Sequence, residues 1–276
     1  MKRISLLIAG LFFLLDGFIN VSTAQSVSVS PSRCFFTATP GQTASQVLAI
    51  SNSSNQPVIF KASFKDFKRD SLGEKIYFDK GTLPLSNANW MEVTPDVIEL
   101  APNQQKTITI TMRVPQNAGA DQNVFNSMLF LSQVNEQQAA TSGNPSAAKS
   151  IGIRIRLEIG IHIYNTPPVF TKKNISFAAF DDITRQTDTI KHFAVKIKNT
   201  GEIIADAQLR FEITDKSSGD EIHLPSKAIS MLPGTEQVVQ LDLPSRLKGK
   251  KYLIVALLDT GVDSDLKVAE KEVAYD

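Results

Sequence analysis

The sequence offers few side chains that could perform catalysis or hold a metal. Asp259-Thr-Gly261 has the residue types of an aspartic-protease triplet, but no second copy supplies the partner carboxylate that such chemistry needs. The run from Asp259 to Asp265 contains three aspartates, yet it lacks the spacing and the final Glu of an EF-hand calcium loop. Because it lies between two apolar segments with strand character, we interpret it as a hairpin turn.

Histidine and cysteine give no stronger signal. His162, His192 and His223 are scattered along the chain without the short spacing of metal ligands. Cys34 follows Arg33, which could activate a thiolate, but the surrounding β-pattern favours a buried structural thiol. No Gly-x-Ser-x-Gly, P-loop or glycine-rich dinucleotide motif is present. We therefore expect no catalytic residue, no metal and no cofactor, and the chain is not predicted to be an enzyme.

The most informative segment is the run from Ile151 to Ile163, in which every odd position is aliphatic. A period of two predicts a strand with one apolar and one polar face, about 40 Å long at about 3.3 Å per residue. Such a length exceeds what a small sandwich needs for its own core. Two interpretations remain open: a partner chain covers the strand by adding its own, or the strand is a long core strand with a neighbour on each side.

The first 24 residues are predicted to be a secretory signal peptide. Met1-Lys-Arg3 precedes an apolar run that is too short to span a membrane, and small residues stand before Gln25 as at a cleavage site. No later stretch is long and apolar enough for a spanning helix. An exported chain with one cysteine cannot build an internal disulfide framework, so its stability must come from its cores. The net charge of +1 argues against nucleic-acid binding.

After the signal peptide, apolar alternation recurs between turn signals about every eight to twelve residues, which is typical of all-β proteins. The expected strands in the first half are 27–36, 45–51, 58–67, 75–78, 97–100, 106–114, 123–134 and 151–164. Those in the second half are 175–180, 192–199, 205–214, 221–224, 237–243, 252–259 and 268–274. We predict an all-β fold with two immunoglobulin-like antiparallel β-sandwich domains in tandem.

Asn165-Thr-Pro-Pro168 interrupts this rhythm, since two prolines cannot continue a strand ladder. The predicted domains are therefore an N-terminal one at 25–165 and a C-terminal one at 166–276. Residues 133–150 are polar and too long for an ordinary hairpin, so we expect a functional or mobile loop that leaves the start of the long strand free.

The order of these elements resembles the periplasmic pilus chaperones of the chaperone–usher pathway. The matching segments are 27–36 with Arg33 before an apolar pair, 48–57 with its Ser-Asn turn, 93–105 with Thr-Pro and Ala-Pro, 123–131, and 161–167. Asn103 stands where the family usually has glycine. The resemblance covers most of the first domain and is looser in the second.

The resemblance implies that the last strand of the first domain is donated to an incomplete pilin, whose groove its aliphatic side chains fill. The donor residues would be Ile153, Ile155, Leu157, Ile159 and Ile161. The implied partners are a pilin or fimbrial subunit and an outer-membrane usher, and the implied location is the periplasm.

The family also binds the terminal carboxylate of its subunit with an arginine and a lysine. Arg33 is at the arginine position, whereas His162 is where the lysine should be. An unperturbed imidazole is mostly neutral at pH 7, so Arg33 could act alone, or Arg154 or Arg156 could assist, or the anchor could be absent.

A second class of function is a structural or adhesive cell-envelope protein, similar to the Gram-positive WxL-interacting proteins, which also pair two such domains. Those proteins usually end in a spanning helix and a basic tail, whereas this sequence ends in a predicted strand, so the chaperone hypothesis is preferred. Under the alternative, the long edge strand would serve self-association.

Overall fold

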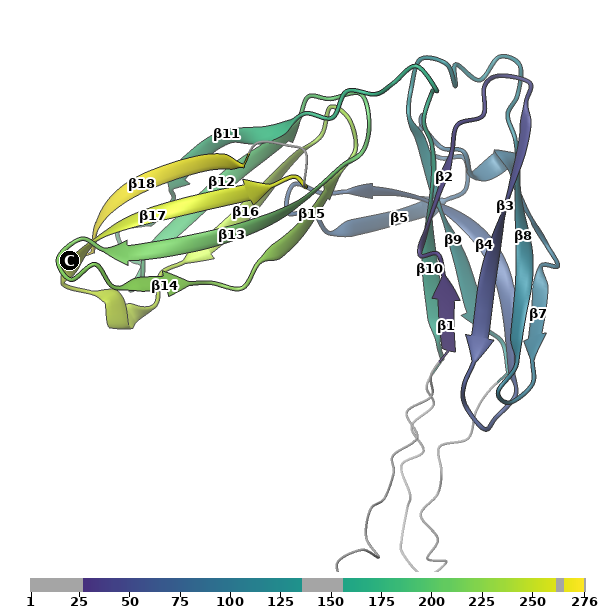
Figure 1. Ribbon diagram of the computed structural model, residues 1–276, viewed down its shortest axis with the longest axis horizontal. Helices are drawn as coiled ribbons and strands as arrows, with labels where there is room; N and C mark the ends of the chain where they lie inside the picture. Colours follow the sequence, from purple (N-terminus) through teal and green to yellow (C-terminus); the bar gives the residue numbers. More distant parts are fainter. Residues whose placement is uncertain (1–26, 136–155, 262–265, 276) are drawn as a thin grey trace, which may run out of the picture.

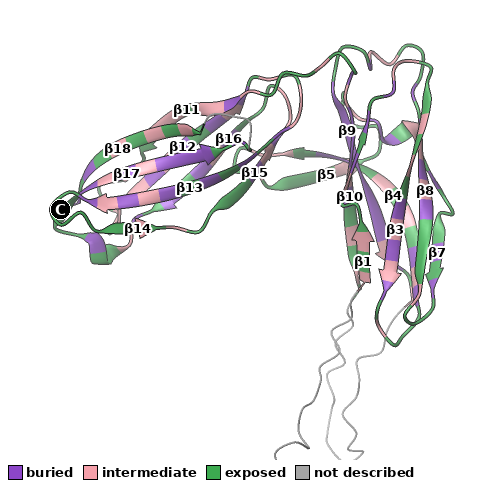
Figure 2. Cartoon of the chain, in the orientation of Figure 1, coloured by how far each residue is buried: buried purple, intermediate pink, exposed green. Residues whose placement is uncertain are grey.

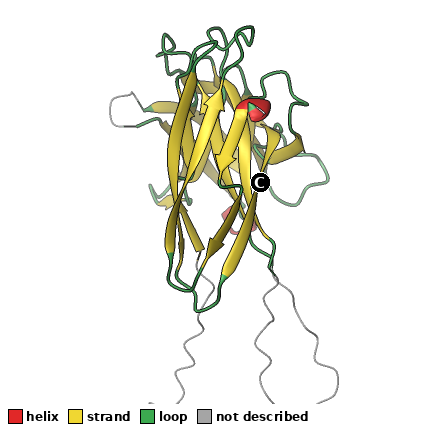
Figure 3. Cartoon of the chain, turned by 90° about the vertical axis from the view of Figure 1, so that its right-hand side faces the viewer, coloured by secondary structure: helices red, strands yellow, loops and turns green. Residues whose placement is uncertain are grey.

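The structure, a computed structural model, describes residues 27–135, 156–261 and 266–275. It confirms the predicted all-β fold, with two immunoglobulin-like sandwiches in tandem that lie at an angle to each other (Figure 1). Figure 3 shows that helix is confined to short turns, among them η2 (Ala88–Trp90) and η3 (Ser245–Leu247). Within the described part of the chain, no helix has the length and hydropathy needed to cross a membrane.

The first sandwich contains two sheets whose inner faces form one core. One sheet has the order β1 (Val27–Ser30), β3 (Thr43–Asn52), β8 (Gln105–Arg113) and β6 (Met91–Thr94). The other has the order β2 (Arg33–Phe36), β10 (Glu158–Asn165), β9 (Phe125–Gln133), β4 (Val58–Arg69) and β5 (Lys75–Asp79), with β7 (Val97–Leu100) also paired to β4. Ile108, Ile110 and Met112 of β8 are buried, as their alternation predicts. Figure 2 shows buried and exposed positions along β8.

The prediction of one strand over residues 27–36 is wrong, because Pro31 divides it. Proline has no backbone N–H to continue a ladder, and the chain changes sheets there. β1 pairs antiparallel with β3, whereas β2 pairs parallel with β10, so the sandwich is not purely antiparallel. The buried Asn165 side chain fixes this pairing by accepting from Ala38 N at 2.9 Å and donating to Ala38 O at 3.0 Å.

The predicted strand over 151–164 also differs from the structure. Arg156 and Leu157 are described but lie outside a strand, and β10 begins only at Glu158. Ile153, Arg154 and Ile155 lie outside the described residues, as do the predicted signal peptide and most of the predicted loop.

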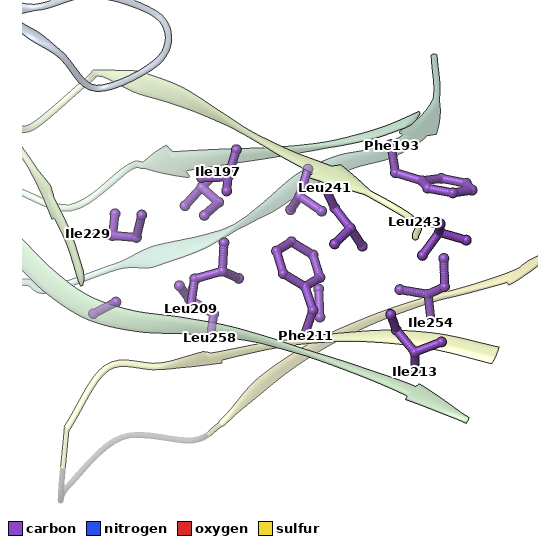
Figure 4. Packing of buried hydrophobic residues seen from close by; sticks show 14 of the residues in the cluster. Phe193, Ile197, Leu209, Phe211, Ile213, Ile229, Leu241, Leu243, Ile254 and Leu258 are labelled. Atoms are coloured by element: carbon purple, nitrogen blue, oxygen red, sulfur yellow. The ribbon is translucent and has the colours of Figure 1, made fainter. Parts of the chain in front are cut away.

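The second sandwich repeats the arrangement with its own core. One sheet has the order β11 (Ile175–Asp182), β12 (His192–Asn199) and β16 (Glu236–Asp242). The other has the order β14 (Glu221–His223), β13 (Ala205–Asp215), β17 (Lys250–Asp259) and β18 (Lys267–Tyr275), with β15 (Lys227–Met231) paired to β13. Figure 4 shows Phe193 and Leu241 of one sheet facing Phe211 and Ile254 of the other across this core.

The connection between the sandwiches docks closely on Gly201. Backbone hydrogen bonds of 2.8 Å join Thr200 N to Asn174 O and Glu202 N to Lys172 O. A Cβ added at Gly201 would lie 2.6 Å from both Asn174 N and Lys172 O, and neither backbone atom can move aside cheaply.

We therefore expect Gly201→Ala to separate the connecting segment from the second sandwich and to cost about 1–3 kcal/mol of unfolding free energy, as overpacking does. Denaturant unfolding measured against the parent chain tests this expectation. An unchanged midpoint would show that the connection yields to the added methyl group without loss.

Candidate functional site

β10 has an open edge over its first half. β9 pairs with β10 along Glu158–Asn165, whereas β2 covers the other side only from His162 onwards. Among the described residues, no strand pairs with Glu158 or Gly160 on that second side. β10 is therefore partly a core strand with two neighbours and partly an edge strand, so coverage by a partner chain stays a prediction for its open half.

The backbone register shows which groups this open edge presents. Gln133 N of β9 donates to Leu157 O at 2.9 Å, and His162 N donates to Ser32 O at 3.1 Å on the opposite side. Backbone hydrogen-bonding groups alternate in direction along an antiparallel strand. The N–H and C=O groups of the odd residues of β10 therefore point toward β9, and those of the even residues point away from it. The N–H and C=O groups of Glu158 and Gly160 therefore point toward the open edge.

The odd side chains of β10 point into the first sandwich to different depths. Ile161 is 0% exposed and belongs to the core, which contradicts its predicted availability as a donor residue. Leu157 and Ile159 are only partly buried and pack at the edge of the same core. A partner could reach these two without opening the sandwich, whereas it could not reach Ile161.

Arg33 and His162 are direct neighbours, as the resemblance requires, because they pair across β2 and β10. Arg33 already has an anionic partner: its Nη1 lies 2.8 Å from both carboxylate oxygens of Asp206 in the second sandwich. The hydrogen bond to Asp206 raises the pKa of Arg33 against an opposing effect of burial. Burial raises the pKa of Asp206, but hydrogen bonds from Arg33 and Ser230 outweigh it and lower that pKa.

His162 is not a cation at neutral pH. Burial, followed by repulsion from Lys75, Arg33 and Arg69, lowers the pKa of His162 to about 4. Its ring packs edge-on against Phe67 at 5.3 Å, and its Nε2 is buried with no hydrogen-bond partner among the described residues. A neutral imidazole cannot supply the second positive charge of a carboxylate anchor.

A cavity of about 980 Å³ lies between the two sandwiches beside this pair. Its charged lining comprises the cations Arg33, Arg69, Lys75, Lys173 and Lys227 and the anions Glu74, Asp206 and Asp259. Sequence reasoning found only Arg33. A signal for Arg69 and Lys75 was nevertheless present in the sequence, because they flank Asp70-Ser-Leu-Gly73, which has the residue types of a turn, and would face each other in a hairpin.

Aromatic side chains cover the outer face of the β10 sheet next to the cavity. Phe67, Met128, Phe130 and Tyr164 form a buried cluster. Ile204 and Leu232 of the second sandwich pack against it, so the two sandwiches share an apolar contact as well as an ion pair. This contact fixes the walls of the cavity.

Among the residues weighed for other chemistry, Cys34 lies in the first core, whereas Asp259 lines the cavity. Cys34 is buried in the first core, and burial raises the pKa of its thiol to about 11, as expected for a structural residue. Asp259 ends β17, and its carboxylate accepts from Gly261 N at 3.0 Å in the turn toward β18. In the described ranges, no group of three or more His, Cys, Asp or Glu side chains is placed to hold a metal ion.

Fold and site together define a tandem β-sandwich protein with an open strand edge beside an interdomain cavity. Structure comparison aligns it with solved fimbrial chaperones over most of its length. A chain of the Salmonella enterica SafA pilin in complex with the SafB chaperone has 16% identity and a TM-score of 0.46, with 90% of this chain and 97% of that chain covered. The Class 5 fimbriae chaperone CfaA has 14% identity and a TM-score of 0.43, with coverages of 90% and 98%.

The E. coli chaperone DraB has 12% identity and a TM-score of 0.43, with 91% of this chain and 97% of that chain covered. The sequence matches no family model, and no curated protein matches it significantly. At identities and TM-scores this low, function must be derived from the residues of this chain.

Proposed function

We propose that this protein is a periplasmic chaperone that binds pilus or fimbrial subunits and stabilises them by donating the strand that leads into β10. The observation that carries the proposal is the open edge at Glu158–Ile161, next to aliphatic side chains that alternate along the same strand. An edge of this kind invites strand addition by another chain. An outer-membrane usher is the expected second partner.

Binding would use both the backbone and the side chains of this strand. The N–H and C=O groups of Glu158 and Gly160 would pair with an edge strand of the subunit, and Gly160 adds no side chain to hinder its approach. The donor side chains are Ile153, Ile155, Leu157 and Ile159, without Ile161. Each such side chain contributes about 1.5–3 kcal/mol when fully buried, before the cost of ordering the segment.

The cationic anchor in this proposal is Arg33 without His162. A subunit carboxylate would compete with Asp206 for the guanidinium group, whose Nη1 lies 2.8 Å from both carboxylate oxygens of Asp206. Arg156 is exposed and lies two residues before β10, so it could assist, as could Arg154.

The first test is affinity purification of the tagged chain from its native envelope, followed by mass spectrometry of the bound proteins. We expect a small β-rich subunit in stoichiometric amount, and at least about a tenfold loss of it in Leu157→Glu, since a carboxylate cannot enter an apolar groove unpaired. Val47→Glu is the matched control, because Val47 is 58% exposed on β3, a strand of the other sheet.

Unchanged capture by Leu157→Glu, or loss by Val47→Glu as well, would contradict donation from this strand. A monomer or self-dimer with no bound subunit would instead favour the structural envelope protein.

A further inference from the structure

A second cavity, of about 440 Å³, lies in the first sandwich, and its lining shares no residue with the interdomain cavity. It is enclosed by the loop between β5 and η2, by η2 itself, by the loop after β8 and by the start of β9. The described residues that line it include no Asp, Glu, Lys or Arg, in contrast to the interdomain cavity. A ligand of this second cavity is therefore uncharged, because nothing in the lining could pair with a charge.

Three polar groups of the lining are free to bind a ligand. The side chains of Asn89 and Asn117 and the indole N–H of Trp90 make no hydrogen bond to another described residue. Asn89 and Asn117 are exposed, and Trp90 is partly buried. An amide side chain both donates and accepts hydrogen bonds, and an indole N–H donates one. Together these groups match a molecule that carries several hydroxyl groups.

Trp90 also supplies an aromatic surface beside these polar groups. Its ring packs on that of Phe125, with the ring centroids 4.6 Å apart and the planes tilted by 44°. Phe125 is 5% exposed and belongs to the first core, so it supports the indole and offers little surface of its own. A proline-rich segment binds in a groove lined with aromatic rings, whereas a single ring beside amide groups suits one small polar ring.

A buried carboxylate orders the loop that carries part of this lining. Asp66 of β4 is 0% exposed and accepts hydrogen bonds from Gly81 N at 3.1 Å and Leu83 N at 2.7 Å. Ser86 Oγ also donates to Asp66 and accepts from Ala88 N at the start of η2. Burying a carboxylate is costly, and this one fixes a surface loop rather than filling the core. Loops positioned by a rigid scaffold commonly carry binding residues.

We infer that this cavity binds a neutral saccharide, a function separate from the donation of a strand. The C–H face of a pyranose ring packs on the Trp90 indole, and the ring hydroxyl groups bind the amides of Asn89 and Asn117. A volume of about 440 Å³ accommodates one or two sugar rings and lies within the usual range of small-molecule sites. Because Asp66 orders the loop in advance, binding loses less conformational entropy there.

The fluorescence of Trp90, the only tryptophan of the chain, tests this inference directly. The purified chain is titrated with glucose, with N-acetylglucosamine and with sorbitol, an acyclic polyol that has hydroxyl groups but no ring face. We expect a saturable change in emission with at least one of the two sugars and none with sorbitol. Tighter binding of N-acetylglucosamine would identify the ligand as an amide-bearing sugar, and tighter binding of glucose would identify it as a plain hexose.

Asn89→Ala and Asn117→Ala should each weaken sugar binding about threefold to tenfold, as loss of a neutral hydrogen bond does. Both side chains are exposed and unbonded, so the unfolding midpoints of the variants should match that of the parent chain. Asn55→Ala is the matched control, because Asn55 is exposed between β3 and β4 and lies outside the cavity lining. It should bind the sugar as the parent does.

The same response to sorbitol as to the sugars, or no saturable response to either sugar, would overturn the inference. Sugar binding that both asparagine variants leave unchanged would overturn it as well. Acetyl-tetraproline amide is titrated in parallel. A response of Trp90 to this peptide and to neither sugar would assign the cavity to a proline-rich segment and would also contradict a saccharide site.

Discussion

Replacing Ile161 by Ala should destabilise the protein by about 2–5 kcal/mol, the usual cost of removing a buried aliphatic side chain from a packed core. Ile161 is 0% exposed, belongs to the first core and lies opposite Leu129 of β9, so the surrounding side chains cannot close the cavity easily. Leu157→Ala, on the same face of the chain four residues earlier, should cost roughly 1 kcal/mol because its side chain is only partly buried. Denaturant unfolding of both variants gives the two values.

The contrast between these variants distinguishes core residues from donated residues. Leu157→Ala should weaken subunit capture more than it lowers stability, whereas Ile161→Ala should lower stability first. If Ile161→Ala unfolds like the parent chain, the first half of β10 is not part of the core and Ile161 belongs with the donor residues after all.

Acidification from about pH 6.5 to pH 4 should destabilise the first sandwich through His162. The pKa of this imidazole is lowered from 6.5 to about 4, chiefly by burial and then by Lys75, Arg33 and Arg69. The unfolded chain therefore binds a proton in this pH range that the folded chain does not bind, and stability falls as pH falls. The full pKa shift of His162 corresponds to about 3 kcal/mol of unfolding free energy. Because the ring is partly exposed, solvent screening reduces this loss to about 1–2 kcal/mol.

Unfolding free energy measured at several pH values in the parent chain and in His162→Gln tests this expectation. The variant should lose most of the slope between pH 6.5 and pH 4. Asp215 affects stability in a different pH range. A hydrogen bond from Lys250 lowers the pKa of Asp215 to about 2, so the contribution of this carboxylate to the unfolding free energy is lost only below about pH 4. If the unfolding free energy falls with pH equally steeply in both chains above pH 4, the pH dependence belongs to groups other than His162.

Strong alternation was sufficient to predict most strands of both sandwiches. Residues 97–100 and 192–199 form strands at the predicted positions, because apolar and polar residues alternate there between turn residues. β6 and β15 were missed, since each is short and has only two large apolar residues in its alternation. The parallel pairing of β2 with β10 could not be predicted, because partner choice between distant strands depends on the whole fold.

The site was only partly predictable for a related reason. Arg33 and the aliphatic face of the last strand are local features, so the sequence pattern reveals them. The contact with Asp206 and the cavity-facing pair of Arg69 and Lys75 depend on how two sandwiches pack. The neutral state of His162 depends on burial, which residue type alone does not report.

The two hydrogen bonds between the Ala38 backbone and the Asn165 side chain have a consequence for the order of folding. These residues are 127 positions apart, and their bonds close the sheet that β2 and β10 share. Contacts between such distant residues form slowly, because a long loop must be closed first. A chain that emerges from its N-terminus onward therefore exposes an incomplete first sandwich until β10 appears. During that interval the chain itself has an unfilled strand position, the same defect that we propose it masks in its subunits.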